Sequence, residues 1–358
     1  MQQKRFQDQG VIIIGATGGL GTAIAHAFAD EGARLLLVGR DTERLEHLAN
    51  EFAAPPTFHP MDLADPSSIE ALGDFVRTAF GQVDVVVNAA GVDVRKSFDQ
   101  HSPDDIRHTV DLDFVGPMLI TRAFLPILRD QNRGALVHVG GFADGRLALP
   151  YFSVDVASRA GLAAFSEALN RELASTEIIV TFFSPSPADT ETEREFHPLW
   201  RKMNLAIAPS QRVAKELLAA IVQHKRVHVM GGLATILFAK INVAFPALAD
   251  ALMLNHYRKI LRQFFESTES TPHSTSKRSW SVRLGVSLVV ASFVLYGGFV
   301  LVPFSDVALE SKIVVSTTLV VLGEASFWIG GAILGKEFVV RYRKWLNPCN
   351  WFCRTKFS

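Results

Sequence analysis

Residues 10–230 alternate short apolar runs with longer segments of helical spacing. Continuous apolar runs of this length are typical of parallel strands that are buried on both faces, and the segments between them would supply the covering helices. The sequence therefore predicts an α/β fold, a doubly wound parallel sheet with helices on both faces. The apolar runs are Val11–Ile14, Leu35–Val38, Val83–Val87, Ala135–Val139, Ile178–Phe183 and Val227–Met230. The segments between them include Leu20–Asp30, Thr42–Phe52, Ser67–Phe80, Asp104–Leu128, Ser158–Leu173 and Gln211–Gln223.

Two long apolar stretches, residues 284–304 and 313–334, follow near the C-terminus. Each has about the 20 residues that cross a hydrocarbon core of ~30 Å. Lysine and arginine flank both outer ends, and positive flanks stay in the cytosol. We therefore predict an integral membrane protein with a two-helix transmembrane hairpin over residues 282–335, and with the predicted sheet domain, the basic tail 336–358 and both termini in the cytosol. Two buried core helices are the alternative, although little other chain is left to cover them.

The segment between the predicted sheet domain (1–231) and the hairpin has two parts. Residues 232–265 mix apolar side chains with four lysines and arginines, which is typical of an amphipathic segment lying in a membrane interface. A lid packed on the domain explains the pattern equally well, so both interpretations stay open. Residues 266–281 read as a polar linker rich in serine and threonine.

Polar and small residues in the second apolar stretch bear on how the hairpin packs. Glu324 lies near its middle, where an ionised carboxylate is costly, so it should face the first stretch, a partner or a ligand. A series of small residues, Ser326, Gly330, Gly331 and Gly335, favours close helix contact. This spacing fits either a tight hairpin or a homo-oligomer.

Charge and cysteine content exclude some classes of function. The formal net charge is zero, which gives no electrostatic case for nucleic acid. The two cysteines, Cys349 and Cys353, are too few for a disulfide framework. Histidine and cysteine do not occur at metal-site spacing, so we expect no metal.

A glycine-rich turn follows the first apolar run and opens a helical segment. Glycines let the backbone approach a diphosphate closely, while the helix N-terminus offers free N–H groups and a positive dipole end. The strand–turn–helix context is the one that a dinucleotide-binding motif requires. The candidate cofactor-binding residues here are Gly15, Thr17, Gly18, Gly19, Leu20 and Gly21.

Arg40 ends the second apolar run, where NAD-binding sites usually carry an acidic residue. A guanidinium at this position can hold the 2′-phosphate of NADP. We therefore predict NADP(H) in preference to NAD(H). The alternative is a surface arginine that pairs with Asp41 or Glu43.

Further motifs in the same order resemble the classical short-chain dehydrogenase/reductase family over about residues 8–230. The resemblance implies a Rossmann fold in which an aspartate contacts the adenine, an Asn-Ala-Gly run supports the sheet beside the cofactor, and a threonine meets the nicotinamide amide. Ser186 stands where the last of these motifs usually has glycine. The matching residues are Asp62 and Leu63, then Asn88, Ala89, Ala90 and Gly91, and finally Thr190 within Pro185–Thr190.

The catalytic positions depart from the family pattern of tyrosine, lysine, serine and asparagine. Gap-free alignment of residues 157–169 places Asp155 at the tyrosine and Arg159 at the lysine, which in the family binds the nicotinamide ribose. Phe142 then falls at the serine, and Asp113 at the asparagine. Arg159 can still donate to a ribose and stays charged at any workable pH.

Asp155 is a poor substitute for tyrosine, because its reference pKa is about 4 rather than about 10. Arg159, four residues later, should keep it ionised. If Asp113 lies close by, repulsion between the two carboxylates would raise one pKa. Tyr151, four residues before Asp155, is a second candidate proton donor if the helix extends that far. Pro150 argues for a loop there, in which case Tyr151 packs.

These features lead to two functional hypotheses. The layout is similar to membrane-bound short-chain reductases that act on lipids, including the ketosphinganine reductase type. The chain would then be an NADP(H)-dependent oxidoreductase acting on a lipid-like carbonyl or alcohol, covered by an apolar loop over residues 191–210. Alternatively, it is a degenerate member that binds NADP(H) without catalysis and serves as a membrane-anchored sensor or scaffold.

Overall fold

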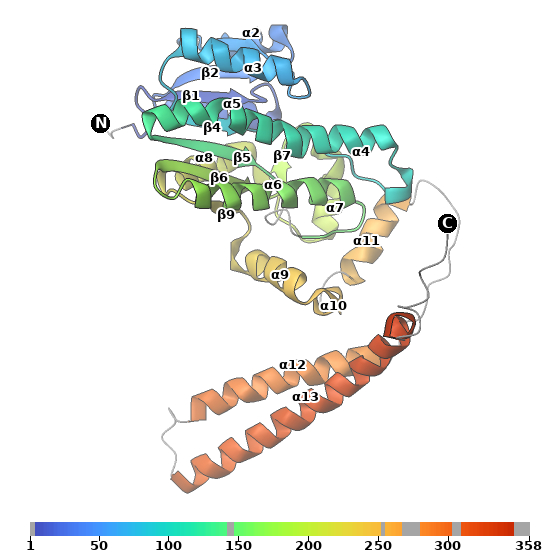
Figure 1. Cartoon of the computed structure of the whole chain (residues 1–358). Coiled ribbons are helices and arrows are strands. Elements are labelled where there is room, and N and C mark those ends of the chain that lie inside the picture. The colour runs from blue at the N-terminus through green and yellow to red at the C-terminus, as the bar shows by residue number, and fades with distance from the viewer. Residues whose placement is uncertain (1–3, 142–146, 252–254, 267–279, 303–308, 347–358) are drawn as a thin grey trace, which may run out of the picture. The chain divides into compact units, whose positions relative to one another are not determined.

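The chain divides into two compact units, Met1–Ser270 and Thr271–Ser358. In the computed structural model the first unit holds the sheet and the helices packed on it, and the second holds two long helices (Figure 1). The residues that the structure describes are 4–141, 147–251, 255–266, 280–302 and 309–346.

The first unit is built on a seven-stranded sheet in which every pairing is parallel, in the order β3-β2-β1-β4-β5-β6-β9. The chain moves outward from β1 in one direction and then returns to build the other half from β4. The crevice where the order reverses, at the carboxyl ends of β1 and β4, is where such sheets bind ligands. The strands are β1 Gly10–Ile14, β2 Arg34–Gly39, β3 Thr57–Pro60, β4 Val85–Asn88, β5 Arg133–Val139, β6 Glu177–Ser184 and β9 Val227–Val229, and a separate pair joins β7 Ala188–Asp189 to β8 Ala208–Pro209.

Helices cover both faces of this sheet, as the apolar runs predict. Val11 and Ile13 of β1 enter the core shared with α1 and α8, and the alternate residues enter the core shared with α3 and α5. The prediction of a doubly wound parallel sheet is confirmed. The helices of this layer are α1 Gly19–Asp30, α2 Thr42–Ala49, α3 Pro66–Phe75, α4 Pro103–Val110, α5 Gly116–Gln131, α6 Ser153–Glu172, α7 His197–Lys202 and α8 Ser210–Val222.

The segment after β9 forms three helices that pack on the first unit: α9 Gly232–Ala244, α10 Pro246–Ala249 and α11 Asn255–Glu266 (Figure 1). Their buried residues, including Phe238 and Leu261, share a core with Phe152 and with Trp200 of α7. Packing on the domain supports the lid interpretation of residues 232–265. It leaves their outer surface open to a further role.

The second unit consists of α12 Trp280–Leu301 and α13 Leu309–Leu346, which run antiparallel and pack together (Figure 1). Within the described residues, Ser311–Ile329 of α13 is the only stretch long and apolar enough to span a membrane. The apolar part of α12, Val290–Phe299, is shorter than a span. One of the two predicted spans therefore corresponds to a helix with the length and composition of a membrane span.

Glu324 of α13 faces α12, the first helix of the C-terminal pair, and this is one of the orientations predicted for it. Its carboxylate accepts hydrogen bonds from the Tyr296 hydroxyl of α12 (2.7 Å) and from the Trp328 indole N–H (2.8 Å). Two donors thus compensate a carboxylate that would otherwise be costly in an apolar helix pair.

We predict that Asn170→Ala destabilises the first unit. The Asn170 amide donates to the Val180 carbonyl (2.6 Å) and accepts from its N–H (3.0 Å), at a point on β6 that the short strand β9 does not reach. Alanine would leave both backbone groups buried without partners, at a cost on the order of 2–3 kcal/mol. The thermal midpoint of the purified chain measures this, with the exposed Glu172→Ala on the same helix as control. Equal midpoints for the two variants would show that the Asn170 side chain does not stabilise the backbone of β6.

Candidate functional site

The turn between β1 and α1 can be made only with glycine at two of its positions. Gly15 has φ +78°, and a Cβ there would lie 2.7 Å from the Ala90 nitrogen. A Cβ on Gly21 would lie 2.0 Å from the Gly15 carbonyl oxygen. Because both positions lack a side chain, the turn can lie close to the end of β4, where Ala90 lies.

The N-terminus of α1 is left open by the same sequence. Its N-cap residue, Gly18, has no side chain to cap the helix, and the first turn holds no acidic residue. The first-turn N–H groups therefore point into the crevice without a side-chain cap, an arrangement that fits a diphosphate. Leu20 and the run from Ala89 to Gly91 line the same crevice.

The other residues carried over from the family pattern divide into lining and support. Thr190 comes directly after β7 and lies close to the start of α1. A Cβ added to Gly19 would lie 2.7 Å from the Cβ of Thr190. Asn88 is buried, and its side-chain oxygen accepts from the Ala90 N–H (3.2 Å), which supports the strand end.

Leu63 is buried against Gly116 and so belongs to the core rather than the crevice. Asp62 is exposed, and its carboxylate accepts from the Ala64 N–H (3.0 Å).

Two arginines lie beside the glycine turn, of which the sequence analysis named only one. Arg40 is exposed at the end of β2, and across the described chain it forms no ion pair with Asp41 or Glu43. The Asp41 carboxylate instead caps α2 by accepting from the Arg44 N–H (3.1 Å). The Arg44 guanidinium donates to the Thr17 carbonyl (3.1 Å), which places a second cation against the turn.

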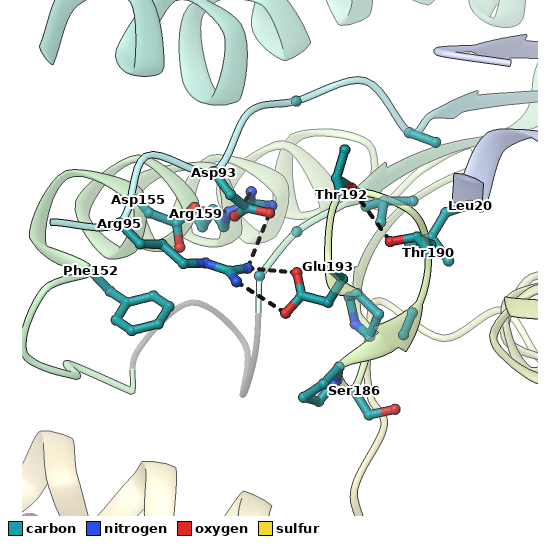
Figure 2. A pocket seen from close by; sticks show the side chains of 18 of the residues that line it. Leu20, Asp93, Arg95, Phe152, Asp155, Arg159, Ser186, Thr190, Thr192 and Glu193 are labelled. Carbon is teal, nitrogen blue, oxygen red and sulfur yellow. Dashed lines mark hydrogen bonds and ion pairs between the residues drawn. The ribbon is translucent and has the colours of Figure 1, made fainter. Parts of the chain in front are cut away.

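The crevice is part of a cavity of about 280 Å³ that is also lined by a cluster of ion pairs (Figure 2). The Arg159 guanidinium contacts Asp155 at 2.5 Å, Asp93 at 3.0 Å and Asp113 at 3.4 Å. Asp155 and Arg159 lie one turn apart on α6, as the gap-free alignment predicted. The cluster thus brings together three of the predicted catalytic candidates, and it adds Asp93.

Asp113 reaches the cluster because the helix is distorted at that point. The residues between α4 and α5, Asp111–Val115, form a π-helical turn, which is frequent at functional sites. Oδ1 of Asp113 accepts from the Val92 N–H (2.9 Å), and Oδ2 is buried without a hydrogen-bond partner in the described structure. Burial raises the pKa of the Asp113 carboxyl to about 7, although the Arg159 guanidinium opposes the rise.

Burial also raises the pKa of Asp155, again against the pull of Arg159. The two carboxylates share one guanidinium, so their titrations are linked and the pair retains a proton more readily than either reference value suggests. Asp155 lines the cavity, whereas Asp113 lies behind it. Glycines leave the necessary room, since a Cβ on Gly141 would lie 2.4 Å from Cδ of Arg159.

A second ion pair, which no sequence pattern indicated, adjoins this cluster through Asp93. The Arg95 guanidinium donates to both carboxylate oxygens of Glu193, at 3.0 and 2.9 Å, and contacts Asp93 at 3.2 Å (Figure 2). The Phe196 ring lies 4.2 Å from the Arg95 guanidinium carbon, and Trp200 donates its indole N–H to Glu193 (2.5 Å). Ninety-eight residues separate the two partners, so no local spacing signals the pair. The apolar inner face expected for residues 191–210 is present.

The structure does not give Tyr151 the helical position on which its predicted role as a proton donor depended, and its side chain packs against α11. Tyr151 has φ +71° and precedes α6, so it does not share a helix face with Asp155. Its hydroxyl donates to Glu266 of α11 (2.6 Å), and its ring stacks on Phe265 at 4.8 Å. Burial and the bond to Glu266 raise the pKa of Tyr151 to about 12. Phe142, the predicted serine position, lies outside the described residues.

Comparison with known proteins assigns the family. The family profile described as short chain dehydrogenase matches residues 9–198, which is more than half of the chain. The chain therefore belongs to the short-chain dehydrogenase/reductase family of oxidoreductases. It is 32% identical to the dehydrogenase/reductase SDR family member 7B of Bos taurus over 266 residues, covering 70% of this chain and 81% of that protein.

Solved structures agree on the fold. A short-chain dehydrogenase from Streptomyces avermitilis aligns with a TM-score of 0.61 at 24% identity, over 72% of this chain and 98% of that one. An actinorhodin polyketide ketoreductase solved with NADPH aligns with a TM-score of 0.56 at 22% identity, over 60% of this chain and 90% of that one. At these identities the likeness shows the fold alone.

We predict that Asp113→Asn stabilises the protein at alkaline pH. A carboxyl with a raised pKa favours folding while protonated, so its contribution is lost as the pH rises from about 4, the reference value, to about 7. Asparagine mimics the protonated acid and should gain on the order of 2 kcal/mol at pH 8 and little at pH 4.5. Thermal midpoints across this range measure the effect, with the exposed Asp111→Asn on the same turn as control. A variant less stable than the parent at pH 8 would show that Asp113 is needed as an anion.

Proposed function

We propose that the chain is an NADP(H)-dependent oxidoreductase, anchored in a membrane, that acts on an apolar, lipid-like carbonyl or alcohol. The observation that carries this proposal is the pair of carboxyls, Asp155 and Asp113, that Arg159 joins, with Asp155 lining the cavity that adjoins the glycine turn. Hydride transfer at carbon requires a proton to join or leave oxygen, and this pair is the acid or base within reach.

The crevice supports a nicotinamide dinucleotide as the cofactor. The open N-terminus of α1 would hold its diphosphate, and Arg40 and Arg44 would hold a 2′-phosphate beside the turn. Following the family pattern, Thr190 would meet the nicotinamide amide and Arg159 its ribose. When bound, such a cofactor supplies the hydride donor or acceptor, and the remaining steps belong to the chain.

Asp155 would exchange the proton with the substrate oxygen, because it lines the cavity and Asp113 does not. An isolated aspartate would be ionised at neutral pH and unable to donate. Burial raises the pKa of Asp113 to about 7 and also raises that of Asp155, which favours a proton on the pair. Reduction would therefore use the protonated pair and slow as the pH rises through about 7, whereas oxidation would use the ionised pair.

The walls of the cavity support an apolar substrate. Leu147, Leu149, Phe152, Val156 and Trp200 line it on the side away from the glycine turn. The apolar stretch Ser311–Ile329 supports attachment to a membrane, where such substrates reside. The basic flanks of the hairpin favour a cytosolic location for the first unit.

A scaffold or sensor that binds NADP(H) without turnover is the second candidate. It is favoured by the saturation of Arg159, whose guanidinium already contacts three carboxylates and the Val92 carbonyl (3.3 Å). A ribose hydroxyl would have to compete with these partners. The two candidates share the cofactor site and differ only in turnover.

We expect Arg40→Ala and Arg44→Ala each to weaken NADPH binding about ten-fold or more and NADH binding much less, because only NADPH carries the 2′-phosphate. Fluorescence titration of the purified chain with both nucleotides measures this. Arg107→Ala, an exposed arginine on α4, serves as control. An equal loss for both nucleotides would remove the basis for NADP(H) preference.

We expect Asp155→Asn to lower turnover about 100-fold or more, since asparagine cannot transfer the proton, while NADPH binding is kept. NADPH oxidation with a panel of apolar ketones measures this, and Tyr151→Phe is the matched control that should retain activity. Asp113→Asn should shift the pH profile of turnover as well as its rate. Tight NADPH binding without turnover on any substrate of the panel would support the scaffold.

A further inference from the structure

The outer surface of α9–α10 exposes a cluster of large apolar side chains. Phe238 and Ala239 face the core of the first unit, while Leu237, Val243 and Phe245 are 56%, 57% and 63% exposed. Side chains of this size are rarely left in water next to one another without a partner. We call the surface formed by the exposed residues of α9, α10 and α11 the lid face.

The lid face is also basic. Lys240 of α9 and Arg258 and Lys259 of α11 are exposed. Over residues 232–266 four lysines and arginines stand against two acidic residues, and one of these, Glu266, is already bound by Arg262 and by Tyr151. Apolar groups flanked by cations suit an interface with anionic lipid headgroups.

The covalent chain keeps the lid face near the membrane, if the hairpin is anchored as proposed. Thirteen residues, 267–279, separate the end of α11 from the start of α12. Even fully extended, they reach at most roughly 45 Å. The tether leaves the first unit at Glu266, which is hydrogen-bonded to Tyr151, next to the cavity-lining Phe152.

We propose that the lid face docks on an anionic lipid bilayer. The inference rests on the proposed membrane anchoring and adds the surface of the first unit that contacts the lipid. Phe152 and Leu149 both line the cavity and share a core with α9 and α11. Docking therefore places an apolar wall of the cavity directly behind the helices that touch the bilayer.

Lipid quenching of single-cysteine variants of the full chain tests the proposal. Cys349 and Cys353 are replaced by serine, and Phe245→Cys, Val243→Cys and Val222→Cys are labelled with an environment-sensitive fluorophore. Val222 is the matched control, because it is an exposed aliphatic residue (46%) at the end of α8, on the amino edge of the sheet and away from the cavity. Each protein is placed in nanodiscs of phosphatidylcholine with phosphatidylserine and a spin-labelled lipid.

We expect labels at 243 and 245 to be blue-shifted and quenched about two- to three-fold more than the label at 222. The difference should shrink in nanodiscs without phosphatidylserine, and likewise in Lys240→Gln/Arg258→Gln/Lys259→Gln. A blue-shifted but unquenched label would mean that protein, rather than lipid, covers the lid face. An unshifted label would mean that the lid face is exposed to water. Either result overturns the proposal. Flotation of the same chain with vesicles after alkaline wash separates this outcome from a failure of the membrane anchor.

Discussion

The first unit depends on one buried guanidinium with more than one counter-charge. Asp155, Asp113 and Asp93 surround Arg159, and each of these comes from a different element: α6, the π-helical turn and the loop after β4. Removing Arg159 would leave these acids without their shared cation, and breaking a buried ion pair in this way typically costs about 3–5 kcal/mol. The cluster therefore fixes the loop after β4 against α6, and with it the rim of the cavity. A lysine and a tyrosine at the same two helix positions would not connect these three elements in this way.

This arrangement changes the chemistry available to the site without changing the fold. Three carboxylates around one guanidinium carry excess negative charge, which burial makes costly, and protonation of one acid relieves it. Asp113 is the acid least able to remain charged, since its Oδ2 accepts no hydrogen bond within the described structure. Arg95 pairs with Glu193 and also contacts Asp93, which joins this second ion pair to the Arg159 cluster.

The sequence was informative where the physical cause is local. Strand periodicity predicted the parallel sheet, and the glycine spacing predicted the turn before α1, where backbone contacts with the end of β4 exclude any other residue at Gly15. The four-residue interval between Asp155 and Arg159 predicted their contact. By contrast, β3 is short and carries only partly buried or exposed residues, so it has no apolar run. The pair of Arg95 and Glu193 joins distant loops, and the positive φ of Tyr151 depends on α11, so neither leaves a local pattern.

The two interpretations of residues 232–265, a lid and an interfacial segment, turn out to be compatible. An amphipathic helix on a membrane surface has one apolar face, whereas these helices carry two: one buried against Phe152 and Trp200, and one exposed around Phe245. Burial of the inner face gives the segment a fixed position on the domain. The outer face is therefore a preformed surface that does not have to become ordered on contact. Less conformational entropy would then be lost in the proposed docking. A periodicity analysis treats apolar residues on both faces as weak amphipathicity, which is why the sequence pattern could not separate the two roles.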